Sequence, residues 1–449
     1  MNGGSAASIA EQARTRERQL LLLALVVVLG AYALMGVAAA GDLPAGTLAY
    51  GGALTALAVV AHLAVRRLTP FADPVILPVA FLLNGLGLVL VRRVDFAQDT
   101  DLAIAQTTWT VVGIGLFALT LLAVTDHRQL ARYRYTAGLA ALVLLLLPMT
   151  PEIGREINGA RLWVDLGPVT FQPGELAKIA MVVFLAGYLE DKRALLSVAT
   201  TRIGPVLLPP VRHLAPVLVA ALGGVAILVA QRDLGSSLLF FGVFVAMLYI
   251  ATGRLAYPSV GIATFAAAGA LAYATFGHVR QRFTIWLDPW APERINDEAY
   301  QLVQSLFALG TGGVTGTGLG LGQPDIPAAA TDAIFAVLGE ELGLLGTTAA
   351  LVCFVLLVAR GYKAALTATD EVGTLLAAGL STILALQVFV IVGGITRLVP
   401  LTGITLPFVS YGGSSLIANY LLIALLLRVS DSARRTARMG RAAARRGPS

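Results

Sequence analysis

Long runs of apolar residues constrain this chain more than any other feature of its sequence. A helix that crosses a membrane needs about 20 mainly apolar residues, and twelve segments of the 449 residues meet that need. Helices and closed barrels alone satisfy their backbone hydrogen bonds in lipid, and barrel strands alternate instead of forming long apolar runs. The sequence therefore predicts an all-α polytopic membrane protein. The predicted spans are 19–40, 46–66, 73–92, 105–124, 134–150, 174–190, 211–230, 233–251, 256–276, 334–359, 372–396 and 409–428.

The composition excludes the other broad classes of protein. Hydrophobic residues make up 57% of the chain and charged residues 13%, against a charged share of about 25% in soluble domains. The single cysteine, Cys353, allows no intrachain disulfide. The four histidines lack the spacing of metal ligands. No Walker A motif is present, so we expect no nucleotide cofactor.

Basic residues set the predicted orientation. With both termini in the cytoplasm, most of the 32 Lys and Arg residues lie in inner segments, as the positive-inside rule requires. We therefore expect a multi-pass protein of the cytoplasmic membrane with both termini inside. The N-terminal segment 1–18 and the basic tail 431–449 are expected to be disordered, with the tail touching anionic lipid. This topology accounts for the net charge of +6 without a nucleic-acid partner.

The longest predicted outer segment is 277–333. Loops of this length in a compact fold are usually functional or disordered, and its Trp and Tyr residues favour order. Residues 300–309 have apolar side chains at helical spacing, which predicts a short helix at the outer leaflet or a plain packing helix. The glycine-rich stretch 310–322 lacks the pattern of a dinucleotide fold. It suits either a tight backbone close to a ligand or to neighbouring helices, or a flexible loop.

Acidic residues at the end of this segment are candidates for chemistry. Asp332 lies just before an apolar helix, where it or Thr331 can cap that helix. Alternatively, Asp332 faces a polar cavity and acts as a general base. Glu340 and Glu341 lie about two turns further along, and acids within a membrane are functional candidates by default. Of these two, Glu340 is expected nearer the Asp332 face.

Charged residues also mark the outer ends of other spans. Glu175 and Lys178 are three residues apart and can pair on one helix face, either to hold helices together or to contact a substrate. Arg232 and Asp233 stand at a second helix end, and Arg161 and Arg397 are further outer cations.

The last span opens with small residues around Ser410 and Ser414. Free N–H groups at such a helix start suit an anion, although close helix packing explains small residues equally well. Several cations and helix N-termini on the outer face together suit a phosphorylated, membrane-anchored substrate.

Four motifs together resemble the SEDS family of peptidoglycan glycosyltransferases over about 70–430. They are Asn158-Gly-Ala-Arg161-Leu-Trp163 with Phe171-Gln172-Pro-Gly-Glu175-Leu-Ala-Lys178, Gln231-Arg232-Asp233-Leu-Gly235, Tyr300-Gln-Leu-Val-Gln304-Ser305 followed by Thr331-Asp332-Ala-Ile-Phe335-Ala-Val-Leu-Gly-Glu340-Glu341-Leu-Gly343, and Gly403-Ile-Thr-Leu-Pro407-Phe-Val-Ser410-Tyr-Gly412-Gly-Ser414-Ser415. Val392-Gly-Gly-Ile-Thr-Arg397 adds a likeness to the actinobacterial RodA branch, while a division paralogue of the FtsW type stays open.

The resemblance implies a core of ten helices at 70–430, and it does not explain two extra helices at 19–66. It implies that lipid II is polymerised with inversion at the donor sugar, with Asp332 as the general base. Undecaprenyl diphosphate leaves, so cations or a divalent metal such as Mg or Mn must neutralise charge. A class B penicillin-binding protein is the implied partner. The residues expected to bind substrate are Arg161, Gln172, Glu175, Lys178, Arg232, Asp233, Gln304, Ser305, Ser410, Gly412 and Ser414.

The sequence departs from the family pattern at one point, and a second function stays open. Many relatives have a polar run such as Pro-Glu-x-His before the Thr-Asp motif, and this chain has Pro327-Ala-Ala-Ala, so those polar side chains play no part here. A lipid II flippase also suits twelve spans with buried charges, but flippases place key charges near the midplane, often within inverted repeats. Most candidate groups here lie on the outer side, which favours chemistry at the outer surface over transport. An inactive scaffold is a third alternative, against which the retained Asp332 in its full motif speaks.

Overall fold

The computed structural model describes residues 3–44, 46–157, 159–167, 169–197, 201–203, 206–208 and 211–444. Asn158, which begins one of the family motifs, lies outside the described residues. The helices are α1 (Gly3–Ala40), α2 (Thr47–Leu68), α3 (Ile76–Gln98), α4 (Leu102–Ala123), α5 (Arg134–Leu146), α6 (Gly174–Ser197), α7 (Val211–Ala230), α8 (Leu234–Thr252), α9 (Ala256–Thr275), α10 (Gly277–Leu287), α11 (Tyr300–Gly312), α12 (Ile334–Thr367), α13 (Glu371–Ile395) and α14 (Gly413–Ala444). Two short 3₁₀ helices, η1 (His127–Tyr133) and η2 (Leu147–Met149), flank α5.

Every predicted span coincides with a helix. Within the described residues, ten helices are long and apolar enough to cross a membrane, so the chain is a multi-pass membrane protein. The predicted spans outside those ten correspond to α6 and α7. Helix α6 has 24 residues but carries charged groups at both ends. In α7, the part at Leu218–Ala230 is a shorter apolar helix.

The N-terminus is more ordered than predicted. Disorder was expected for 1–18, but α1 begins at Gly3 and runs through that segment into the first span. Ala13 and Glu17 are buried and continue the face formed by Leu21. The Glu17 carboxylate accepts hydrogen bonds from Arg66, and it also lies 2.7 Å from the His62 ring. The prediction of disorder was wrong because a charged residue can be buried when it is paired.

The C-terminal tail also differs from the prediction. Helix α14 continues to Ala444, so the part of 431–449 that the structure describes is helical. Asp431 accepts a hydrogen bond from the Phe71 backbone N–H at 2.8 Å, and Arg434 pairs with Asp73. Basic residues that the composition assigned to a free tail therefore hold α14 against the chain that leads into α3.

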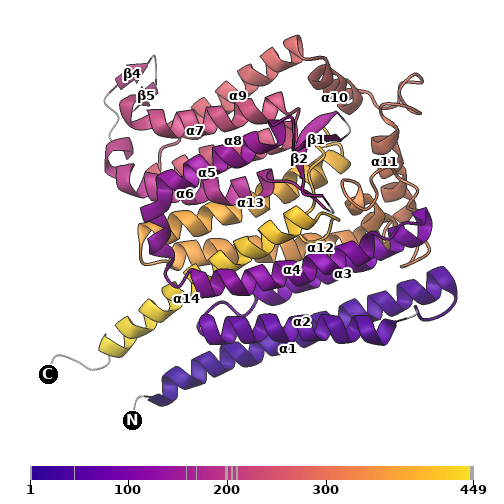
Figure 1. Cartoon of the computed structure of the whole chain (residues 1–449), viewed down its shortest axis with the longest axis horizontal. Helices are drawn as coiled ribbons and strands as arrows, with labels where there is room; N and C mark the ends of the chain where they lie inside the picture. The colour runs from indigo at the N-terminus through magenta and orange to yellow at the C-terminus, as the bar shows by residue number, and fades with distance from the viewer. Residues whose placement is uncertain are drawn as a thin grey trace. The chain divides into compact units, whose positions relative to one another are not determined.

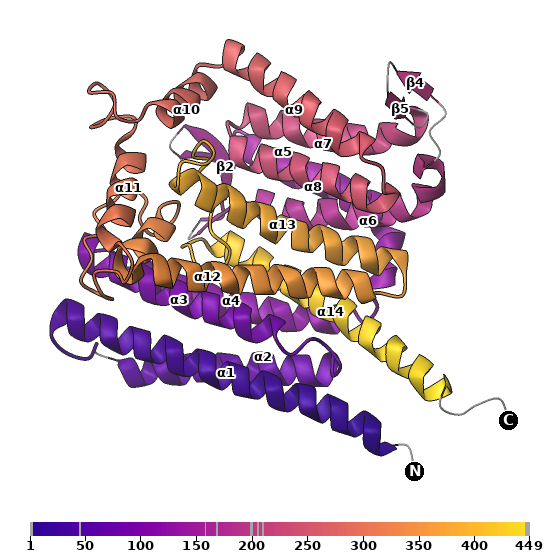
Figure 2. The same ribbon diagram turned by 180° about the vertical axis from the view of Figure 1, so that it is seen from behind.

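The described chain divides into two compact units. Unit 1 comprises Met1–Asp126, Tyr300–Thr369 and Thr405–Ser449. Within it α1 packs along α3 and α2 along α4, so the two N-terminal helices form a layer on the others (Figure 1, Figure 2). Helix α12 packs on α3, and α14 packs on α4.

Unit 2 comprises His127–Ala299 and Asp370–Ile404. Helix α13 packs against α6 and α8, and α5 packs against α6. A three-stranded antiparallel sheet of β1 (Gly154–Ile157), β2 (Ala160–Asp165) and β3 (Thr170–Phe171) precedes α6. A hairpin of β4 (Thr201–Ile203) and β5 (Val206–Leu208) follows α6. The sequence did not predict these strands.

The long outer segment contains the helices α10 and α11. Helix α11 confirms the short helix predicted at 300–309. Helix α10, at the start of the segment, was not predicted. Its C-terminal end is tied to Arg397, because Arg397 Nε donates to the Trp286 carbonyl at 2.8 Å and the Trp286 indole donates to the Arg397 carbonyl at 3.1 Å. Arg397 therefore fixes an element of unit 2, which favours a structural role over a free outer cation.

Candidate active site

Asp332 lies on the turn that leads into α12. The helix N-cap is Ala333, whose side chain makes no capping hydrogen bond. The Thr331 hydroxyl donates instead to the Ala328 carbonyl, and the Ala333 N–H donates to the same carbonyl. Thr331 thus uses its hydroxyl within a tight turn, and capping of α12 by Asp332 stays a prediction. Asp332 itself is half-buried.

The start of α14 borders this turn. The Ser410 hydroxyl donates to the Thr331 carbonyl at 2.6 Å, and the Tyr411 N–H donates to the Ala330 carbonyl at 2.7 Å. Two motifs that are far apart in sequence thus meet at Asp332. Ser410 therefore lies beside the turn that carries Asp332, and its hydroxyl holds that turn. Its contact with a substrate stays a prediction.

Gln106 on α4 links the same region from another side. Its amide nitrogen donates to the Ser410 carbonyl at 3.1 Å, and its oxygen accepts from the Gly412 N–H at 3.2 Å. Gly412 therefore has its N–H directed at protein, while Ser414 is buried in the first turn of α14. Sequence reasoning missed Gln106, because a single Gln in an apolar span gives no signal of its partners.

Gln304 and Ser305 lie on α11 and differ in exposure. Ser305 is fully buried and its hydroxyl donates to the Gln301 carbonyl one turn earlier. This bond favours a packing role for Ser305 over contact with a substrate. Gln304 is half-buried and stays a candidate.

Helix α12 is broken at Gly343, where φ is 63° and ψ is −165°. The break frees backbone groups that would otherwise pair within the helix. The carbonyls of Glu340 and Glu341 accept from the N–H groups of Thr317 and Gly318 at 2.9 and 3.0 Å. Across the break, the N–H groups of Leu344 and Leu345 donate to the carbonyls of Gly313 and Val314, at 2.9 and 3.1 Å.

The glycine-rich stretch is therefore a docked segment. We call residues 313–326 the glycine loop. Its backbone completes the hydrogen bonds of the broken helix, so the tight-backbone interpretation of 310–322 is favoured over a flexible loop.

Buried charges fix the glycine loop in place. Glu341 accepts from Arg93 Nε at 2.7 Å and from the Gly320 N–H at 3.1 Å. Arg93 also donates to the Gly322 carbonyl, and Glu340 accepts from the Gln323 N–H at 3.0 Å. Glu340 and Glu341 thus hold the loop that leads to Asp332. Sequence reasoning did not single out Arg93, whose partner is 248 residues away.

In unit 2, Glu175 and Lys178 form the predicted pair. Their side chains are 2.8 Å apart and almost fully buried. Lys178 Nζ also donates to the Gln387 amide oxygen on α13 at 3.1 Å. The pair therefore joins α6 to α13, and its burial gives Lys178 a fixed position. Gln172, two residues before α6, is half-buried.

Arg232 and Asp233 stand at the start of α8. Asp233 caps the helix by accepting from the Ser236 N–H at 2.8 Å. The exposed Arg232 donates to the Gly159 carbonyl, at the turn of the β1–β2 hairpin, at 3.4 Å. Arg161 on β2 is also exposed and pairs with Glu156 at 3.1 Å. Both arginines are thus connected to the β1–β2 hairpin of unit 2.

Two residues of α10, Arg282 and His278, interact with the surroundings of Arg232. Arg282 on α10 donates to the Leu401 carbonyl at 2.8 Å. Burial, together with the positive charges of Arg232 and Arg282, lowers the pKa of His278 below its usual value. His278 is therefore neutral at neutral pH, and the local charge comes from the arginines.

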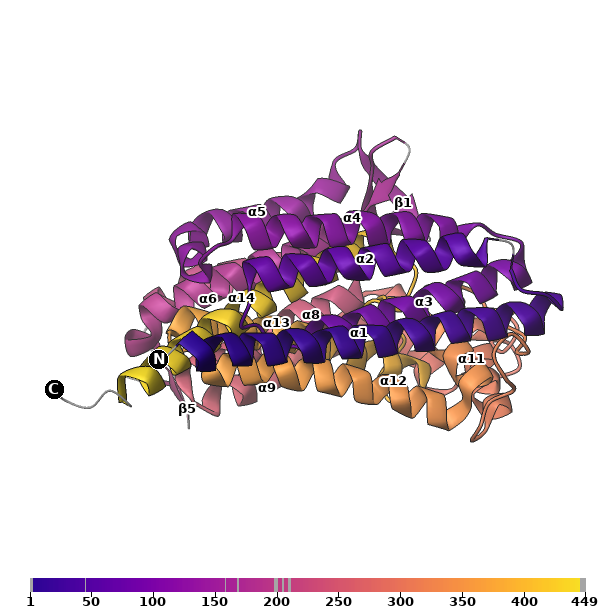
Figure 3. The same cartoon turned by 90° about the horizontal axis from the view of Figure 1, so that it is seen from below.

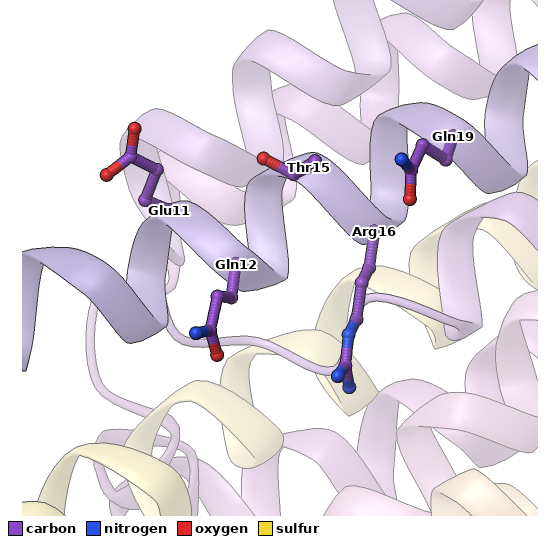
Figure 4. A pocket seen from close by; sticks show the side chains of 5 residues that line it. All are labelled: Glu11, Gln12, Thr15, Arg16 and Gln19. Atoms are coloured by element: carbon purple, nitrogen blue, oxygen red, sulfur yellow. The ribbon is translucent and has the colours of Figure 1, made fainter.

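No group of three or more His, Cys, Asp or Glu side chains gathers as a metal site among the described residues. Figure 4 shows a shallow hollow lined by Glu11, Gln12, Thr15, Arg16 and Gln19. All five come from α1, and none is a predicted site residue.

Comparison with known proteins gives consistent matches. A family model for FtsW, RodA and SpoVE, described as cell cycle protein, matches residues 74–435. A peptidoglycan glycosyltransferase RodA of Mycobacterium tuberculosis (strain ATCC 25618 / H37Rv) is 46% identical over 433 residues, covering 94% of this chain and 92% of the relative. A probable peptidoglycan glycosyltransferase FtsW of Geobacter sulfurreducens (strain DL-1 / KN400) is 36% identical over 371 residues, covering 80% of this chain and 95% of the relative.

A solved structure from a peptidoglycan synthase study is similar in fold. It is a chain from a study of the structural coordination of polymerization and crosslinking by a peptidoglycan synthase complex. The TM-score is 0.65 at 29% identity, and the match covers 81% of this chain and 98% of that one. The mycobacterial match covers more of the chain. Because that match covers 94% of this chain, it must include part of the segment before residue 74, where the two N-terminal helices lie.

Proposed function

The chain belongs to the family of cell cycle proteins that includes FtsW, RodA and SpoVE, and from that premise we propose that it is a peptidoglycan glycosyltransferase of the RodA type. The observation that carries the proposal is the 46% identity to proteins named peptidoglycan glycosyltransferase RodA, over 94% of the chain. The match to an FtsW covers 80%, which favours RodA and a role in cell-wall elongation over the division paralogue.

Asp332 is the proposed general base. The acceptor 4-hydroxyl of lipid II gives its proton to the Asp332 carboxylate, and its oxygen forms the bond to the anomeric carbon of the donor. The bond from that carbon to the diphosphate breaks, and the electron pair leaves with undecaprenyl diphosphate. The half-buried position of Asp332 supports this role, because a base needs both access to its substrate and partial exclusion of water.

The leaving diphosphate needs positive charge. Arg161, Arg232 and Lys178 are the candidates from unit 2, and the exposed arginines have the access that a diphosphate requires. A divalent cation such as Mg or Mn would add to that charge by binding the diphosphate oxygens. No nucleotide is needed, since the activated substrate already carries the leaving group.

A penicillin-binding protein is the proposed partner. The matched structure comes from a peptidoglycan synthase complex in which polymerization and crosslinking are coordinated, and crosslinking requires a transpeptidase. We propose a class B transpeptidase for this chain. Both termini are proposed to be cytoplasmic, which places Asp332 at the outer face, where the growing wall lies.

The test is polymerisation of lipid II by the purified chain with its transpeptidase, in the presence of Mg or Mn. Asp332→Asn should lower the rate of glycan formation by about 10²–10⁴-fold, the usual contribution of a general base. Asp325→Asn is the matched control, because Asp325 is an exposed acid on the same segment. Equal rates for the two variants would reject Asp332 as the base. No polymer from the folded wild-type complex would reject the enzymatic function.

A further inference from the structure

The outer end of α1 touches the glycine loop. Gly320 has a φ of +86°, and a Cβ atom there would lie 2.6 Å from the Met35 carbonyl oxygen, 2.9 Å from Ala38 Cβ and 3.2 Å from the Ala39 nitrogen. These distances leave no room for a side chain. The backbone of the loop therefore lies directly against the backbone of the first helix.

Helix α1 is firmly seated at this position. Its buried residues Leu21, Leu25, Val28 and Met35 recur at helical spacing and form one stripe. Helix α1 packs along α3 by that stripe, and Figure 3 shows the two helices running side by side. At its other end, Glu17 is held by Arg66. A helix fixed along its length presents a rigid surface to the loop.

The glycine loop is held from the opposite side by α3 and α12. The Gly320 N–H donates to Glu341, and the Gly322 carbonyl accepts from Arg93. Gln98 donates to the carbonyls of Pro324 and Ile326, at 3.1 and 3.4 Å. The loop is thus enclosed between the end of α1 and these polar groups. The chain leaves this enclosure at Ile326, six residues before Asp332.

We propose that α1 is a positioning element for the reaction. Its contact with Gly320 keeps the glycine loop hydrogen-bonded to Glu341 and Arg93. The loop in turn fixes the position of Asp332. This rests on the proposed function. It gives a role to helices that lie outside the family match at 74–435. A small misplacement of a catalytic group can cost about 10²-fold in rate, so the contact should act on kcat more than on stability.

Gly320→Ala tests the contact, and Gly318→Ala is its control. Both glycines have positive φ, +86° and +107°, so both variants carry backbone strain. A Cβ at Gly318 would meet only the side chain of Leu321, which is exposed and can move. We expect Gly320→Ala to lower kcat for lipid II polymerisation by roughly tenfold or more relative to Gly318→Ala, with KM for lipid II unchanged.

A second variant approaches the same contact from α1. Ala38→Leu enlarges the side chain whose Cβ is among the three atoms nearest to a Cβ at Gly320. Ala40→Leu makes the same change two residues further along, at a residue that is equally exposed and contributes none of those three atoms. Only Ala38→Leu should reduce kcat. This variant also decides the question if Gly320→Ala does not fold.

The outcomes separate the two proposals. Equal kcat for both members of each pair, or a change confined to KM, would overturn the positioning role of α1. Loss of polymer in Asp332→Asn together with normal kcat in Gly320→Ala would leave the enzyme assignment intact and reject only this inference. Absence of polymer from the wild-type complex would reject the proposed function itself.

Discussion

Two acidic regions at the start of α12 differ in how their carboxylates are used. Asp332, on the turn before the helix, is half-buried. Glu340 and Glu341, inside the helix, have exposed fractions of 5% and 0%. Glu341 accepts from Arg93 and from the Gly320 N–H, and Glu340 accepts from the Gln323 N–H. The inner acids hold the chain together, whereas Asp332 retains access to the surface.

This difference refines the rule that acids within a membrane are functional candidates. A general base must come within hydrogen-bond reach of a substrate proton. Glu341 can reach a substrate only by giving up Arg93 and the glycine loop. Burial therefore decides which of three nearby acids is suited to chemistry, and charge alone does not.

The largest expected effect comes from neutralising the accessible acid, Asp332, and comparing it with a neutralised inner acid, Glu340. Asp332→Asn should reduce lipid II polymerisation by about 10²–10⁴-fold and leave the melting temperature close to that of wild type. Glu340→Gln keeps the shape of a less accessible acid and should retain activity within about tenfold. The two variants are compared by initial rate per folded molecule. A larger loss of rate in Glu340→Gln would reverse the roles assigned to these residues.

The next largest effect concerns stability. Arg93→Met removes the partner of a fully buried carboxylate, so it should lower the free energy of unfolding by about 3–5 kcal/mol. The double variant Arg93→Met/Glu341→Met should recover most of that loss, since no buried charge is left unpaired. Denaturant or thermal unfolding in detergent measures both. If the double variant is as unstable as the single one, Glu341 does not hold the loop through its charge.

The helices could be predicted because a membrane imposes their length and apolar composition. The N-terminal and C-terminal segments were wrongly predicted to be disordered, and the reason is physical. Glu17 and Arg434 read as solvent-exposed charges, but each is paired with a residue contributed by another helix or its flanking chain. Such pairs depend on the fold and cannot be read from local composition.

The site was predicted in part. Asp332 and Ser410 were identified through the family resemblance, and the structure brings Ser410 to Thr331. Arg93 and Gln106 were missed, because single polar residues in apolar spans do not reveal their partners. The break at Gly343 was missed as well, since an isolated glycine in a helical pattern is ordinarily tolerated.

A variant of Gly343 tests the break in α12 that lies directly after Glu340 and Glu341. Its φ of +63° and its contact with Gly316, whose nitrogen would lie 2.3 Å from an added Cβ, exclude a side chain. Gly343→Ala should therefore cost roughly 1–3 kcal/mol in unfolding free energy. Gly310→Ala is the control, because nothing lies within 4 Å of its added Cβ. Equal stability of the two variants would show that the break tolerates an ordinary residue.

The smallest effect concerns Asp370, a paired acid outside the spans. Burial raises the pKa of Asp370, but hydrogen bonds from His127 and the Gly373 N–H, with the charge of Arg128, lower it to about 2. The unfolded value is higher, at 3.8, so the ionised group stabilises the fold above about pH 4. That contribution, about 2 kcal/mol at neutral pH, is lost as the pH falls from about 4 to about 2.

Asp370→Asn should therefore be less stable than wild type by up to about 2 kcal/mol at pH 7, and the difference should vanish toward pH 2. The Asn side chain can still cap α13, so the variant removes the charge and keeps the cap. Unfolding free energies measured across this pH range test the expectation, and polymerisation at pH 7 should be unchanged. A difference that is independent of pH would mean that Asp370 acts through its shape and hydrogen bonds. In that case Asp370 would differ from Glu341, whose role is assigned to its charge pair with Arg93.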